Sequence, residues 1–138
     1  MIYVDGRITK NFTVAEIANN SANDLCKLVF TPELVSFAAL LQTLRDQHGK
    51  PLKVNSWYRT AEFNRRVGGS SNSLHLQGRA VDLDVSSHSE QERLVKLWRE
   101  ICLANNRIGG ANLYPSLIHL DDFENFFGND SFVLRIRR

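Results

Sequence analysis

The chain carries its most informative residues in one stretch, Ser73-Leu74-His75-Leu76-Gln77-Gly78-Arg79-Ala80-Val81-Asp82. A second stretch, Leu117-Ile118-His119-Leu120-Asp121, follows after an interval. Together they offer imidazole and carboxylate groups, which are ligands that zinc takes at roughly 2.0–2.2 Å. A catalytic zinc site supplies three protein ligands and leaves the fourth position for water. His75, Asp82 and His119 are therefore candidate zinc ligands.

Both stretches show the alternation of a half-buried strand. In residues 80–85 the Val and Leu side chains share one face, and the two Asp side chains share the other. Residues 117–121 repeat the pattern, with Ile and Leu on one face and His119 and Asp121 on the opposite face. Two such strands side by side would line one cleft. A glycine before the first strand allows a bend that folds His75 back over it.

Other segments predict helices interleaved with short strands. The helical signals include a Thr-x-x-Glu capping box at residue 13 and a proline in a first turn at residue 32. The predicted helices cover 13–19, 31–48, 61–67 and 89–105, and further strands cover 52–55 and 132–136. Because no regular crossover unit joins the strands, we expect one α+β domain over residues 1–138, with a central antiparallel sheet flanked by helices.

Length and composition restrict the class of protein. At 138 residues the chain can bury one core, and we expect a monomer. A formal charge of +2 without a Lys/Arg run gives no indication of a nucleic-acid partner. No segment approaches the roughly 18 uninterrupted apolar residues of a membrane span. Cys26 and Cys102 lie in apolar or helical contexts, where we expect buried free thiols.

Four motifs follow one another along the chain. They are Ser56-Trp57-Tyr58-Arg59-Thr60, Asn64-Arg65-Arg66-Val67-Gly68-Gly69, the stretch 73–82, and Tyr114-Pro115 leading into His119-Leu120-Asp121. In this order they resemble the M15 family of zinc peptidases, the D-Ala-D-Ala carboxypeptidases and endolysin-like peptidases that act on bacterial cell-wall peptides. The resemblance spans about residues 11–122. It implies a fold like that of the hedgehog and D,D-peptidase domains.

The resemblance also implies roles for single residues. By the family's pattern, His75, Asp82 and His119 hold the zinc ion. Arg59 lies at the cleft, where it holds a substrate carboxylate, and Ser73 belongs to the same site. The implied cofactor is Zn²⁺, and the implied partner is a peptidoglycan peptide.

The sequence departs from the family's pattern in two places. Many members carry Asp or Glu as a general base three residues before the last zinc histidine, and Ser116 stands there in this chain. Members closer to this sequence end in Tyr-Pro, a few residues and His-x-Asp, which implies that Asp121 acts as the base. The family's small residue before the Tyr-Arg pair is Trp57 here, and we expect it to reshape a subsite.

Two interpretations remain open for several of these residues. Asp84 either accepts a hydrogen bond from a zinc-bound histidine or is a solvated residue. The Asp121-Asp122 pair also fits a helix start before Phe123. On residue chemistry alone, Arg59 is more often a surface salt-bridge residue, and the resemblance reverses that preference.

The leading hypothesis is a zinc peptidase that cuts stem or cross-link peptides of peptidoglycan with metal-activated water. The alternative is an inactive metal-binding or structural module on the same fold, for instance a phage particle component that lost hydrolysis when the base became Ser116. Residues 1–7 lack the positive start and apolar run of a secretory signal. We therefore expect a chain made in the cytoplasm that acts on cell wall after release or as part of a phage particle.

Overall fold

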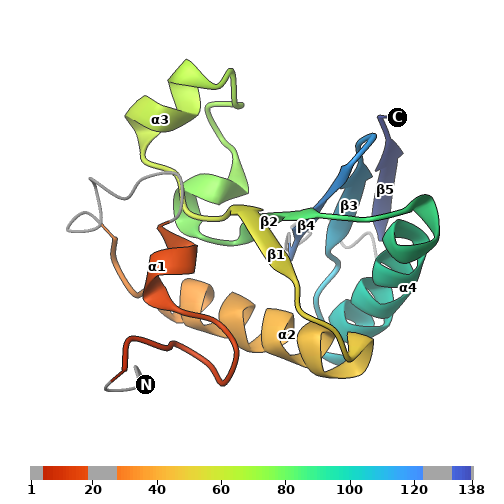
Figure 1. Cartoon of the computed structure of the whole chain (residues 1–138). Coiled ribbons are helices and arrows are strands. Elements are labelled where there is room, and N and C mark those ends of the chain that lie inside the picture. Colours follow the sequence, from red (N-terminus) through yellow and green to blue (C-terminus); the bar gives the residue numbers. More distant parts are fainter. Residues whose placement is uncertain (1–4, 19–27, 123–131, 138) are drawn as a thin grey trace.

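The computed structural model describes residues 5–18, 28–122 and 132–137, and Figure 1 shows their arrangement. The elements, in chain order, are α1 (Val14–Ile17), α2 (Pro32–His48), β1 (Lys53–Ser56), α3 (Ala61–Arg66), the 3₁₀ helix η2 (Leu74–Gln77), β2 (Ala80–Asp84), α4 (His88–Ala104), β3 (Gly110–Leu113), β4 (Leu117–Asp121) and β5 (Val133–Ile136). The elements predicted from the sequence are present to within a few residues. Strand β3 and the 3₁₀ helix η2 are additional.

Threonine and serine side chains begin the helices. Thr31 at α2, Thr60 at α3 and Ser87 at α4 each accept a hydrogen bond from the backbone N–H three residues further on. The capping box predicted at Thr13 is present at the start of α1. Helix α2 ends at Gly49, whose φ of 75° lies in the left-handed region that glycine favours. These contacts are local in the chain, and the helix boundaries could therefore be predicted from sequence.

The described strands form one sheet in the order β1-β2-β4-β3-β5. Neighbouring strands are antiparallel from β1 to β3, and β5 is parallel to β3. The prediction of an α+β fold is confirmed, but the sheet is mixed where we expected an antiparallel one. The reason is that β5 pairs with β3 and not with β4, its neighbour along the chain. Both β3 and β5 run in the direction opposite to β4, and β5 is therefore parallel to β3.

The apolar side chains of the central strands fill the core. Val81 and Leu83 of β2 and Ile118 and Leu120 of β4 are fully buried, as their alternation predicted. Helices α2 and α4 contact each other, and α4 also contacts β3 and β4. Figure 1 shows α3 away from these two helices, on the other side of the strands. The polar face of the sheet is therefore left for the loops around α3 and η2.

Trp57 joins the core to the turn that carries His75. Its side chain is fully buried and meets the rings of Phe12 and Phe37 edge-on, with 5.8 Å between centroids in both pairs. Its Nε1 donates a hydrogen bond to the carbonyl of Gly78 at 2.8 Å. The expectation that Trp57 reshapes a subsite is wrong, because the indole packs into the core.

Cys102 of α4 is a buried free thiol, as predicted. Burial, with smaller contributions from Asp122 and Asp121, raises the pKa of this thiol to about 12, so it is a poor nucleophile at neutral pH. Cys26 and the helix start considered at Phe123 lie outside the described residues. Within the part of the chain that the structure describes, no helix has the length and apolar character needed to cross a membrane.

Gly78 and Gly68 form a matched pair for testing how tightly η2 is packed. Both have positive φ, 68° and 74°. A Cβ on Gly78 would lie 2.5 Å from Leu34 Cδ1, whereas a Cβ on Gly68 meets nothing within 4 Å. We expect Gly68→Ala to cost about 1–2 kcal/mol of backbone strain, and Gly78→Ala to cost roughly 1–3 kcal/mol more through overpacking. Urea unfolding in the presence of a metal chelator measures the free energy of unfolding of both variants. Equal losses of stability would show that Leu34 moves aside without cost.

Candidate metal centre

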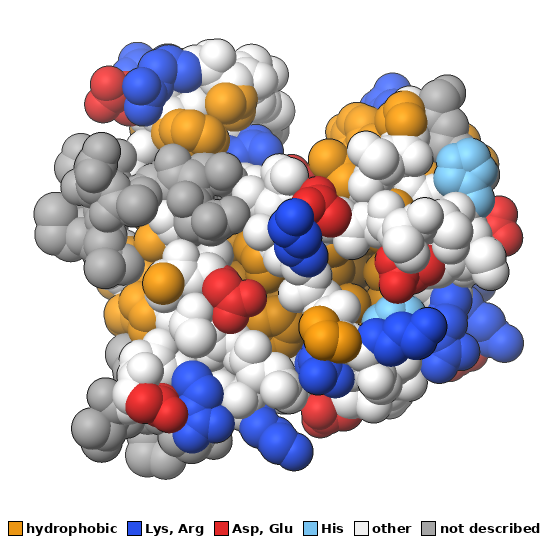
Figure 2. Space-filling model, viewed as in Figure 1, with side chains coloured by type: hydrophobic (Ala, Val, Ile, Leu, Met, Phe, Trp, Pro, Cys, Tyr) orange, Lys and Arg blue, Asp and Glu red, His pale blue; other side chains and the backbone are white. Residues whose placement is uncertain are grey.

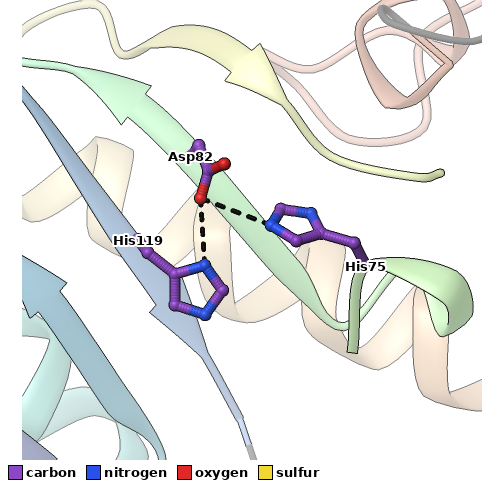
Figure 3. Close-up of side chains that lie close together, drawn as sticks. All are labelled: His75, Asp82 and His119. Atoms are coloured by element: carbon purple, nitrogen blue, oxygen red, sulfur yellow. Dashed lines mark hydrogen bonds and ion pairs between the residues drawn. The ribbon is translucent and has the colours of Figure 1, made fainter. Parts of the chain in front are cut away.

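Three side chains from separate elements meet at the polar face of the sheet (Figure 3). His75 comes from η2, Asp82 from β2 and His119 from β4, and the last two are direct cross-strand partners. Asp82 Oδ1 lies 3.3 Å from His75 Nε2 and 2.9 Å from His119 Nδ1. One ligand atom of each residue lies within 4.8 Å of the other two. The structure thus brings together the three ligands expected from the sequence.

Each imidazole is held at the nitrogen that faces away from Asp82. His75 Nδ1 lies 2.6 Å from the carbonyl oxygen of Trp57, and because a carbonyl can only accept, this nitrogen carries a proton. His119 Nε2 lies 3.1 Å from Asp121 Oδ2, which fixes the second ring in the same way. The Nε2 atom of His75 and the Nδ1 atom of His119 are therefore turned toward the common carboxylate.

The buried carboxylate and one imidazole form a coupled pair. Burial raises the pKa of Asp82, but hydrogen bonds from His119 and His75 outweigh this effect and hold the pKa well below its usual value. Burial lowers the pKa of His119, but hydrogen bonds to Asp121 and Asp82 outweigh it and raise the pKa to about 9. At neutral pH and without a metal, the site therefore holds an ionised Asp82 beside a protonated His119.

Arg59 reaches the same site from the loop after β1. Its side chain is 16% exposed, and its nitrogens donate to Ser56 Oγ at 3.2 Å, Asn64 Oδ1 at 3.3 Å and Asp82 Oδ2 at 3.2 Å. A planar guanidinium held at three nitrogens has a fixed orientation. The interpretation of Arg59 as a surface salt-bridge residue is therefore wrong, and the side chain lies beside the candidate metal ligands.

Asn64 contributes to the site although its role was not predicted. It is 2% exposed, and its Nδ2 donates to the carbonyl of Ser70 at 2.8 Å while its Oδ1 accepts from Arg59. A Cβ on Gly69 would lie 2.0 Å from Asn64 Oδ1, so the close approach of the loop requires glycine. The signal in the sequence was an Asn followed by a Gly-Gly pair. That pattern does not say which side chain the Asn holds.

A cavity of about 690 Å³ lies over these side chains. Figure 2 shows the molecule hollowed between the lobe that carries α3 and the lobe that carries the ends of β3 and β4. The wall of the cavity includes Ser73, Asn112, Tyr114, Ser116 and Asp121. Ser73 also accepts a hydrogen bond from the backbone N–H of His75 at 3.2 Å, and it thereby helps to form the turn that carries this ligand.

The contact expected between Asp84 and a metal-binding histidine is not made. Asp84 Oδ1 accepts from Asn55 Nδ2 at 3.1 Å, and Asp84 Oδ2 lies 3.5 Å from Lys53 Nζ. The distal nitrogens of both histidines have other partners, a backbone carbonyl and Asp121. Asp84 is therefore a partner of strand β1 and stands at the edge of the site.

Asp121 is the last residue of strand β4, and its side chain lies at the candidate metal site. Its carboxylate lines the cavity and contacts the distal nitrogen of His119. The next residue, Asp122, is buried and accepts a hydrogen bond from Arg79 Nε at 2.9 Å. The role of Asp121 as a general base stays a prediction, since the contact with His119 is also one that orients a ligand.

The donor set fits a metal ion. Two imidazole nitrogens and one carboxylate oxygen are a set that zinc takes in catalytic sites with a fourth position open. Orientation of each imidazole by a second hydrogen bond is typical of metal-binding histidines. Within the described residues, His75, Asp82 and His119 are the group of side chains close enough together to hold such an ion.

The sequence profile of the family described as Peptidase M15 matches residues 10–121. The chain belongs to this family. A stretch of 48 residues is 46% identical to the zinc D-Ala-D-Ala carboxypeptidase of Streptomyces albus G. This stretch covers 34% of the chain and 19% of that relative, so the similarity concerns a part of each protein. The family resemblance inferred from the four motifs is confirmed.

Removal of one ligand should weaken metal binding. We expect the purified chain to hold about one zinc ion per molecule, and His75→Ala and His119→Ala to hold far less, because each loses one of the three ligands. His88→Ala changes an exposed histidine at the start of α4 and should bind zinc as the parent does. Elemental analysis after dialysis measures the content. Equal zinc in all four proteins would exclude these ligands.

Metal binding should be linked to pH through His119. Because its pKa is raised to about 9, this imidazole is protonated at pH 8 in the metal-free chain and must lose the proton to bind a metal. We expect zinc binding at pH 8 to release about one proton from His119, and the release to shrink as pH passes about 9. Calorimetry in buffers of different ionisation enthalpy counts the proton.

The same pKa has a consequence for stability without a metal. The pKa of His119 is higher in the folded chain than its unfolded value of 6.5, so the proton on His119 stabilises the fold. This stabilisation is fully present below pH 6.5 and is lost as pH rises through about 9. Urea unfolding of the metal-free chain should therefore show a falling stability between these pH values. If His119 were already neutral at pH 8, zinc binding at that pH would release no proton from it, and the stability would stop falling before pH 8.

Proposed function

We propose that this chain is a zinc-dependent peptidase that hydrolyses peptide bonds in bacterial peptidoglycan, in stem or cross-link peptides. Membership of a peptidase family and the partial similarity to a zinc D-Ala-D-Ala carboxypeptidase support the class of reaction. The observation that carries the proposal is the cluster of His75, Asp82 and His119 beneath an open cavity, with Arg59 beside it.

The residues of the cluster would hold and orient the ion. A zinc ion with three protein ligands supplies a water of lowered pKa and polarises the scissile carbonyl. His75, Asp82 and His119 would provide the ligands. The Trp57 carbonyl and Asp121 hold the two imidazoles with their other nitrogens turned toward Asp82. Both contacts involve the ring nitrogens that face away from Asp82, so they can persist when an ion binds.

Arg59 would hold a carboxylate of the peptide. A guanidinium has five N–H donors, and Ser56, Asn64 and Asp82 take one from each of its three nitrogens. One N–H on each terminal nitrogen is then left for a ligand. Two parallel hydrogen bonds to one carboxylate are a geometry that lysine cannot reproduce.

Asp121 is our candidate for the residue that accepts the proton of the attacking water. It lines the cavity as a carboxylate, whereas Ser116, at the position where many members of the family carry the base, has only a hydroxyl. Asp121 also contacts His119 and thereby orients this ligand. Loss of a proton acceptor lowers turnover at saturating zinc, whereas loss of an orienting contact lowers zinc affinity.

A metal-retaining binding module is the second candidate function. The observation that favours it is Ser116 in the cavity wall, where the usual base would stand. Such a module would hold zinc and a peptide without cleaving it. Incubation of purified peptidoglycan with the zinc-loaded chain, followed by mass spectrometry of the released fragments, distinguishes the two functions and identifies the bond that is cut.

Asp121→Asn separates the two tasks of this residue. Asn keeps an oxygen that can accept from His119 but cannot take a proton, so at saturating zinc we expect turnover to fall by roughly 100- to 10,000-fold. Asp84→Asn is the control on the same sheet face and should stay within a few fold of the parent, because Asp84 contacts Asn55 and Lys53. Unchanged turnover in Asp121→Asn would place the base elsewhere. An inactive parent with zinc bound would support the binding module.

A further inference from the structure

The register of the sheet sets five side chains in a row across the cavity face. Ser56 pairs with Asp82, Asp82 with His119, His119 with Asn112, and Asn112 with Arg135. Residues directly opposite each other on neighbouring strands point to the same side of a sheet. The row therefore runs from β1 to β5 through two of the candidate metal ligands, and it ends in an arginine.

The proposed function leaves the β5 end of this row unused. Asn112 lines the cavity next to His119. Arg135 is exposed, and its Nη1 donates to Asn112 Oδ1 at 3.4 Å. The amide nitrogen of Asn112 and the remaining N–H groups of Arg135 are donors without an assigned task. Asn112 thus offers a donor in the cavity wall, and Arg135 offers donors on the same face of the sheet, one strand further out.

Arg135 differs in its surroundings from two other arginines of the molecule. Arg59 pairs with Asp82, and Arg79 pairs with Asp122. The hydrogen bond of Arg135 is to a neutral amide, and among the described residues no carboxylate pairs with it. An exposed guanidinium without an acidic partner, fixed next to a second donor, is suited to bind a carboxylate.

We propose that Asn112 and Arg135 bind a second carboxylate of the peptide substrate, on the N-terminal side of the bond that is cut. Arg59 approaches the metal ligands from the β1 side, and Arg135 lies on the β5 side, so the ligands stand between two arginines. With the C-terminal carboxylate at Arg59, the N-terminal part of the peptide crosses β3 and β5. The inference rests on the proposed function and adds the substrate class, a peptide with an acidic group upstream of the scissile bond.

The strand spacing sets how far this acidic group stands from the bond. Neighbouring strands are about 4.8 Å apart, so the backbone of β5 lies roughly 10 Å from that of β4. An extended peptide advances about 3.4 Å per residue. Because the side chain of Arg135 reaches back to Asn112, the carboxylate belongs to about the second or third residue before the bond.

Two pairs of synthetic peptides test the proposal. All end in D-Ala-D-Ala. The variable residue is the second before the scissile bond in one pair and the third in the other pair. It is Glu in one member of each pair and Gln in the other, so the two members differ by one charge. We expect the zinc-loaded parent to cleave the Glu member of at least one pair with about tenfold higher kcat/KM. Arg135→Gln should bring this ratio close to one, and Arg135→Lys should give an intermediate ratio, because lysine keeps the charge without the planar fork.

Arg99→Gln is the matched control. Arg99 is an exposed arginine of α4 that lines a groove with Leu134 and Ile136, the β5 residues on the side of the strand opposite to Arg135. Its replacement removes the same charge and should leave both the rate and the ratio as in the parent. A ratio that falls equally in Arg99→Gln and Arg135→Gln would show that net charge alone attracts the acidic peptide, and this would overturn the proposal.

Two further outcomes would overturn the proposal. One is a parent that cleaves the Glu and Gln members of both pairs equally well, and the other is an unchanged ratio in Arg135→Gln. If the parent cleaves no peptide at all, the proposed function fails by itself. Calorimetry of the same peptides with the zinc-loaded parent then tests the second carboxylate, and equal affinities for Glu and Gln peptides would exclude it.

Discussion

The buried carboxylate of Asp82 is the constraint on which the rest of the site depends. Asp82 is 9% exposed, and an ionised carboxylate at such a position is costly unless donors surround it. His119 and Arg59 donate to it, and His75 Nε2 lies 3.3 Å away, so three different parts of the chain contact this carboxylate. Loss of one partner from a buried charged cluster typically costs about 3–5 kcal/mol. The 3₁₀ turn, strand β4 and the loop after β1 are therefore tied to β2 through one side chain.

This arrangement suits both a metal-free and a metal-loaded chain. Without a metal, the protonated imidazole of His119 lies between the carboxylates of Asp82 and Asp121 and reduces their mutual repulsion. A bound cation would take over that task as the proton leaves. The ligands are thus held in place by charge before the ion arrives, and the same charges make its binding sensitive to pH.

Two buried residues connect this site to the remainder of the fold. Trp57 places its indole in the core and uses its own carbonyl to hold His75, so the core and one ligand share a residue. Asn64 lies beneath the cavity wall and holds both Arg59 and the carbonyl of Ser70. We therefore expect a change in core packing near Trp57 to move His75, and a change at Asn64 to move Arg59.

Local patterns along the chain made His75, Asp82 and His119 candidate ligands, and the resemblance to the M15 family assigned them the metal. Local patterns also predicted the helix boundaries and the polar face of two strands, because a strand repeats every two residues and caps act within one turn. They were not enough to predict which strands become neighbours. Gly110–Leu113 combines small residues with an Asn and carries no strand signal, yet as β3 it sets Asn112 beside His119. Asp84 and Asp121 share the predicted face but acquire different partners, Lys53 and Asn55 for one and His119 for the other. Strand order depends on pairing between distant segments, and no local periodicity specifies that pairing.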